Sequence, residues 1–146
     1  MIILIICLFY IIDNATTPRI FAAYDSHLKW LKLYCKPSHP SPIGLDMTYK
    51  IGHFYVTTLS MKMPLFRYKD IDRNPAITVG LAVTSGKSEE DYTYLAQSIK
   101  THGKVNALVY GTDGEPALEA AMESTFPITG KILLNCRICM IIIYIL

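Results

Sequence analysis

The sequence predicts an α/β fold with a mixed β-sheet in a single main domain. Three successive runs of β-branched and aromatic residues follow a proline-rich break, and two segments with apolar residues at helical spacing come later, separated by another apolar run. A helix between two strands favours a parallel pair. With 146 residues and 51% hydrophobic content, the chain can form a folded core.

The first two strands are predicted at residues 43–49 and 53–62, which read IGLDMTY and HFYVTTLSMK. The intervening KIG contains a glycine and has the length of a hairpin turn. A third strand is predicted at residues 75–85, which read PAITVGLAVTS. The preceding stretch KPSHPSPIG is typical of a loop or linker, so we place the start of the domain at residue 43.

A helix is predicted after the third strand, with Ser88 as its N-cap, Asp91 three residues later and Gly103 at its end. Its apolar stripe, which should pack on the sheet, comprises Tyr92, Leu95, Ala96 and Ile99. A fourth strand is expected at residues 104–111, a second helix at 115–126 with Pro116 in its first turn, and a fifth strand at 130–140. Before residue 43 we predict only a helix, within residues 24–34.

Three antiparallel strands followed by alternating helix and strand are the order of a ribonuclease H-like fold. In that arrangement the first and fourth strands are neighbours in the sheet, which brings Asp46 and Asp113 toward each other. Two converging carboxylates repel unless a cation lies between them, and their hard oxygen ligands suit Mg²⁺ or Mn²⁺. For Asp113 alone, an N-cap role at the following helix is an open alternative. Asp46 lies inside a predicted strand, where a carboxylate is costly unless paired or metal-bound.

Three blocks of the sequence carry a family resemblance. They read GLDMTYKIGHFYVTTLSMKMPLF, NPAITVGLAVTSGKSEEDYTYLAQSI and ALVYGTDGEPALEAAMESTFP, in this order and over roughly residues 43–128. Together they resemble the catalytic core of the Mutator-like element (MULE) transposases, DDE-type enzymes with a ribonuclease H-like fold. The phrases LDMTYKIG, YVTTL, EDYTYL and TDGEPAL are more specific in combination than any one of them.

The resemblance implies that Asp46 and Asp113 are the first two members of an acidic triad that binds Mg²⁺ or Mn²⁺ for DNA cleavage and strand transfer. Glu115 belongs to the same motif, and we expect it in the first helical turn rather than on the metal. The implied partner is DNA, with a homo-oligomer as a further expectation, no small-molecule cofactor, and a nuclear location.

The family's third acid is a glutamate beyond the fifth strand, whereas this sequence has no Asp or Glu after Glu123. We therefore expect a C-terminally truncated fragment of a transposon-derived transposase, with residues 43–135 as a partial core and 136–146 as an apolar tail. Such a fragment should be inactive alone. The alternative is a non-catalytic DNA- or protein-interaction module of the same fold.

The first 42 residues are interpreted as an apolar segment and linker. Residues 1–12 are continuously apolar but too short to span a bilayer, so they leave open a small secreted or membrane-tethered protein, with Asn14 as a glycosylation acceptor. The Cys136–Cys139 pair lacks further zinc ligands at the usual spacing, and we interpret it as incidental in a reducing compartment. The formal charge of +2, from scattered Lys and Arg, does not by itself predict nucleic-acid binding.

Overall fold

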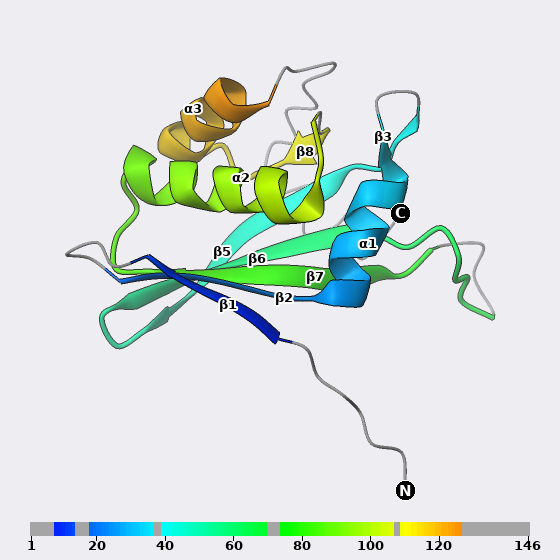
Figure 1. Ribbon diagram of the computed structural model, residues 1–146, viewed down its shortest axis with the longest axis horizontal. Helices are drawn as coiled ribbons and strands as arrows, with labels where there is room; N and C mark the ends of the chain where they lie inside the picture. The colour runs from blue at the N-terminus through cyan, green and yellow to red at the C-terminus, as the bar shows by residue number, and fades with distance from the viewer. Residues whose placement is uncertain (1–7, 14–17, 37–38, 70–73, 107–108, 127–146) are drawn as a thin grey trace, which may run out of the picture.

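The computed structural model describes residues 8–13, 18–36, 39–69, 74–106 and 109–126 (Figure 1). Within them the fold is α/β, with a mixed six-stranded sheet and three helices. The sheet strands are β1 (Leu8–Asp13), β2 (Arg19–Tyr24), β5 (Ile43–Ile51), β6 (Phe54–Lys62), β7 (Ala76–Thr84) and β8 (Tyr110–Gly111). The helices are α1 (Asp25–Tyr34), α2 (Glu89–Gly103) and α3 (Pro116–Thr125). A separate two-stranded ladder joins β3 (Cys35–Lys36) to β4 (His39–Pro40).

The strand order of the main sheet is β1-β2-β7-β6-β5-β8. The strands β5, β6 and β7 form the predicted antiparallel trio, and the turn between the first two contains Gly52 with φ +61°. A positive φ is a conformation that glycine adopts without steric cost, which explains why the hairpin turns there. β8 pairs with β5 in parallel, because β5, β6 and β7 alternate in direction and helix α2 returns the chain from the end of β7, so that β8 runs the same way as β7 and β5.

Two strands of this sheet were not predicted from the sequence. β2 pairs with β7, and β1 pairs with β2, so the sheet continues through residues that precede position 43. The expected helix within residues 24–34 is confirmed as α1. Among the described residues of the predicted strand at 104–111, Tyr110 and Gly111 are confirmed as strand, while Lys104 is still the left-handed C-cap of α2. The predicted strand at 130–140 and the tail at 136–146 lie outside the described residues.

The three helices contribute to one hydrophobic cluster with the sheet. All four predicted stripe positions of α2 are buried, and they pack in the same cluster as Leu28 and Leu31 of α1 and Leu118 of α3. The strand residues Phe21, Leu45 and Leu59 belong to the same core, and Figure 1 shows the sheet beneath α2 and α3. At roughly 1.5–3 kcal/mol for each large apolar side chain fully buried, this cluster is the main source of stability.

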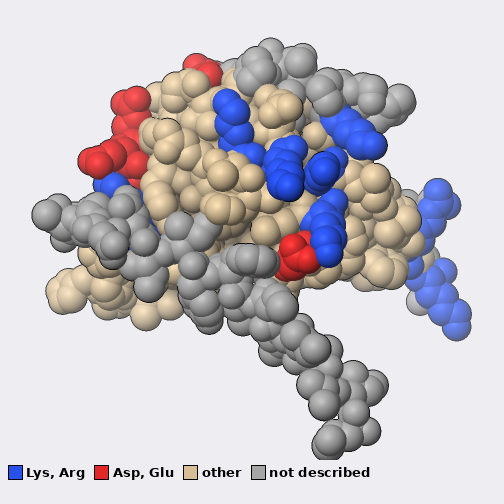
Figure 2. Space-filling model, viewed as in Figure 1, with Lys and Arg blue, Asp and Glu red and all other residues tan. Residues whose placement is uncertain are grey.

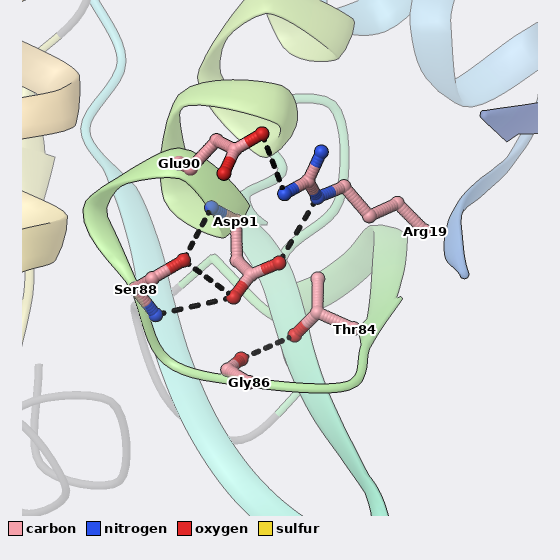
Figure 3. Close-up of polar contacts among 6 residues, drawn as sticks. All are labelled: Arg19, Thr84, Gly86, Ser88, Glu90 and Asp91. Atoms are coloured by element: carbon pink, nitrogen blue, oxygen red, sulfur yellow. Dashed lines mark hydrogen bonds and ion pairs between the residues drawn. The ribbon is translucent and has the colours of Figure 1, made fainter. Parts of the chain in front are cut away.

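The N-terminus of α2 is fixed by a buried ion pair. The Arg19 guanidinium, from β2, donates from Nε to Asp91 Oδ1 at 3.0 Å, and its Nη2 lies 3.0 Å from Glu90 Oε1. Figure 3 shows this side chain reaching across to the first turn of the helix. The side chains of Arg19 and Asp91 are only 7% and 6% exposed, so their charges are desolvated together.

Asp91 also closes the predicted capping box with Ser88. The Ser88 hydroxyl accepts from the Asp91 N–H at 3.2 Å, and the Ser88 N–H donates to Asp91 Oδ2 at 3.1 Å. Gly86 lets the loop pass close to this carboxylate, because a Cβ there would lie 2.8 Å from Asp91 Oδ2. The carboxylate of Asp91 therefore holds the loop after β7, the start of α2 and strand β2 together.

Replacing Arg19 by Met should lower the free energy of unfolding by about 3 kcal/mol or more, because the Asp91 carboxylate then stays buried without its cation. Urea unfolding measures the change. Lys29→Met is the matched control, since the Lys29–Asp25 pair is exposed and spaced i,i+4, and such pairs are worth only about 0.3–0.5 kcal/mol. Equal losses in the two variants would contradict the assignment of Arg19 as the anchor.

The contribution of this ion pair should disappear in acid. Burial raises the pKa of Asp91, but hydrogen bonds from Ser88 and Arg19 outweigh it and hold the pKa below its ordinary value. A depressed pKa stabilises the fold above the unfolded-state pKa of about 4, and this stability is lost as the pH falls through the folded-state pKa. The stability difference between wild type and Arg19→Met should therefore narrow below about pH 4. A difference that stayed constant to lower pH would contradict this.

Candidate functional site

The two predicted site residues, Asp46 and Asp113, each follow a residue that is paired across two neighbouring strands of the sheet. In the parallel pairing of β5 with β8, Gly44 is opposite Gly111. Each aspartate follows two residues after its glycine, Asp46 within β5 and Asp113 just beyond the end of β8. The structure therefore places side by side the strand segments that lead into these two residues, which are 67 positions apart in sequence.

Asp46 occupies an interior strand, between β6 and β8. Its neighbours Leu45 and Met47 belong to or pack against the hydrophobic core. Because side chains alternate along a strand, the Asp46 carboxylate points to the opposite face from these two. It is partly exposed, and its backbone carbonyl accepts from the Thr58 hydroxyl at 3.2 Å. Partial exposure lowers the cost of placing a carboxylate in a central strand.

Asp113 lies in the short loop between β8 and α3, and its side chain is exposed. Its Oδ1 accepts from the Thr112 hydroxyl at 3.2 Å, and the next residue, Gly114, has φ +80°. The alternative N-cap role is wrong, because the N-cap of α3 is Glu115 and the helix begins at Pro116. Proline suits the first helical position, since it has a preset φ and its missing N–H needs no partner there.

Glu115 stands immediately before the helix, as its N-cap, rather than in the first turn as expected. Its backbone carbonyl accepts the Glu119 N–H at 3.0 Å, while its side chain makes no capping bond. Instead Oε2 accepts from the Tyr92 hydroxyl at 2.8 Å and lies 3.9 Å from Lys87 Nζ. The Glu115 carboxylate is thus engaged by α2 and by the loop before it.

Two lysines surround an aromatic ring beside this carboxylate. Lys50 Nζ and Lys87 Nζ lie 5.5 and 5.4 Å from the centre of the Tyr55 ring, within the range of cation–π attraction. Neither these residues nor the hydroxyl of Tyr92 were predicted from the sequence. The helical pattern placed Tyr92 in the apolar stripe, but a partner of its hydroxyl more than twenty residues away leaves no local signal.

Asp46 and Asp113 could supply two carboxylate ligands to a hard cation from adjacent chain segments. Among the residues that the structure describes, no three or more His, Cys, Asp or Glu side chains gather in a group that could hold a metal ion. Two carboxylates alone would leave most coordination positions of a cation such as Mg²⁺ to water or to substrate oxygens.

Comparison with models of known protein families finds no match for this chain, and comparison with curated proteins finds none either. In the described part of the chain, none of the helices has the length and apolar character needed to cross a membrane.

Cys35 is a buried free thiol, and burial raises its pKa to about 11. This thiol is therefore protonated and unreactive near neutral pH.

Substituting Asn for Asp113 should change the free energy of unfolding by less than about 0.5 kcal/mol, as is usual for an exposed side chain outside a cap. Ser88→Ala, which removes a true capping hydroxyl, should cost about 1 kcal/mol. Thermal and urea unfolding of both variants test this contrast. A loss at Asp113 as large as that at Ser88 would restore a structural role for the aspartate.

Proposed function

We propose that the chain is a DDE-type, ribonuclease H-like transposase core that binds a divalent cation through Asp46 and Asp113. The observation that supports this most directly is the parallel pairing of Gly44 in β5 with Gly111 in β8, because each glycine comes two residues before one of the aspartates. The motif resemblance over residues 43–128 adds the substrate class, a DNA phosphodiester. A bound Mg²⁺ or Mn²⁺ would polarise a phosphoryl oxygen and stabilise the leaving oxygen.

The residues of this chain are better suited to binding a metal ion and DNA than to catalysing strand cleavage. Two carboxylates neutralise two positive charges, and two-metal phosphoryl transfer uses a larger set of anionic ligands. The sequence has no Asp or Glu after Glu123, and the Glu115 carboxylate is held by Tyr92 and near Lys87. We therefore propose metal and DNA binding by this chain, with strand cleavage dependent on a carboxylate from elsewhere.

Mn²⁺ titration followed by electron paramagnetic resonance tests the metal site. Asp46→Asn and Asp113→Asn should each weaken binding by more than about tenfold, since even residues that only support a ligand change metal affinity by about 10–100-fold. Glu89→Gln is the control, because Glu89 is exposed in the first turn of α2 and carries the same charge. Equal affinity in all three variants would refute the metal site.

A second candidate function, a non-catalytic DNA-interaction module, is favoured by the distribution of lysines. Figure 2 shows Lys and Arg side chains gathered over α1 and the C-terminal half of α2, away from the acidic start of α2. The lysine face, as we name this surface, consists of exposed residues on α1, on β3 and at the end of α2: Lys29, Lys32, Lys36, Lys100 and Lys104. The fold thus collects charges that are scattered along the sequence, and such a face attracts phosphates.

The salt dependence of binding to duplex DNA, measured without a divalent metal, tests the DNA-interaction module. If the lysine face binds the phosphate backbone, the triple variant Lys32→Gln, Lys36→Gln and Lys104→Gln should reduce the slope of log K against log salt. The expected reduction is about 0.9 for each phosphate that a replaced lysine had neutralised. A control with the same charge change replaces Lys62, Arg67 and Lys69, all at or after the end of β6. Equal slopes in the two variants would exclude the lysine face as the DNA-binding surface.

A further inference from the structure

The hydroxyl of Tyr92 lies between the two chain segments that carry the candidate aspartates. Tyr92 is in the first turns of α2 and is 2% exposed. Its Oη donates to Glu115 Oε2 at 2.8 Å and lies 3.5 Å from Met47 Sδ. Met47 directly follows Asp46, and Glu115 comes two residues after Asp113. One buried oxygen therefore touches both segments.

The two contacts differ in strength. A phenol has one proton to donate, and a carboxylate is a far better acceptor than a thioether sulfur. The proton therefore belongs to the bond with Glu115, while the Met47 sulfur lies against the hydroxyl oxygen. The bond holds Glu115, the N-cap of α3, and the contact with Met47 holds β5.

We propose that Tyr92 is a positioning residue, whose hydrogen bond to Glu115 and contact with Met47 set the relative position of Asp46 and Asp113 for cation binding. This inference rests on the proposed function for its metal, but its geometric part concerns the protein alone. Tyr92 would act through its neighbours, as residues behind metal ligands commonly do.

The protonation state of the hydroxyl supports this role. Burial raises the pKa of Tyr92, and the hydrogen bond and charge of Glu115 and the charges of Asp113 and Asp91 raise it further. The hydroxyl therefore remains a donor throughout the neutral range.

The competing interpretation is that Glu115 itself binds the cation and Tyr92 only packs in the core. Lys87 argues against this, because its ammonium lies 3.9 Å from the same Glu115 oxygen that Tyr92 binds. An oxygen with a hydrogen-bond donor and a neighbouring cation is a poor ligand for a second cation. Glu115→Gln separates the two interpretations, since the amide oxygen can still accept from Tyr92 but ligates metal weakly.

The experiment compares wild type, Tyr92→Phe, Glu115→Gln and the control Tyr94→Phe, a partly buried tyrosine on the same helix. The first readout is the Mn²⁺ affinity. The second, measured without metal, is the set of NMR chemical shifts and amide exchange rates at residues 46–47 and 113–117. Tyr92→Phe should keep the overall fold, perturb both segments together, and weaken Mn²⁺ binding by about tenfold or more. Glu115→Gln should stay within about threefold of wild type, well below the range for residues that support a ligand.

Each outcome decides the inference. If Tyr92→Phe leaves both segments as they are in Tyr94→Phe, or if it moves them without changing Mn²⁺ affinity, Tyr92 is not a positioning residue. A larger loss of affinity in Glu115→Gln than in Tyr92→Phe would make Glu115 a ligand and overturn the assignment. If wild type binds no Mn²⁺ yet both segments move in Tyr92→Phe, the positioning geometry holds and the proposed function fails.

Discussion

The parallel pairing of β5 with β8 is the constraint on which the rest of the structure depends. Parallel neighbours cannot be joined by a tight turn, so the chain must return along the sheet before β8 begins. Helix α2 makes this return, and its position is fixed where it starts, by the capping box and by Arg19 from β2. The pairing of β8 with β5 therefore depends on a buried ion pair between α2 and a strand in another part of the sheet.

The sequence predicted those features whose conformation is determined by residues close to one another in the chain. Ser88 and Asp91 satisfy each other's backbone groups within one turn, and the apolar stripe that follows has the period of a helix. Gly52 and the alternating residues around it suffice for the β5–β6 hairpin. The pairing of β5 with β8 followed from element order alone, because the sheet topology has few alternatives.

The features that escaped prediction depend on contacts that are distant in sequence. Arg19 and Asp91 are 72 positions apart, and no pattern in the residues around Arg19 predicts that its side chain is buried. The strand β2 was missed because its short run of apolar residues lacks a turn signal that separates it from α1. Asp113 was open to a capping role because any Asp before a helix fits that pattern, whereas Gly114 and Pro116 move the start of α3 beyond it.

The central claim is that Asp46 and Asp113 share one cation, with Tyr92 supporting their arrangement. A crystal structure of the chain grown with Mn²⁺, with anomalous diffraction recorded at the manganese edge, tests it most directly. We expect an anomalous peak within about 2.0–2.3 Å of a carboxylate oxygen of each aspartate, the distance of a hard cation to oxygen. A peak elsewhere, or carboxylates directed to opposite faces of the sheet, would contradict it.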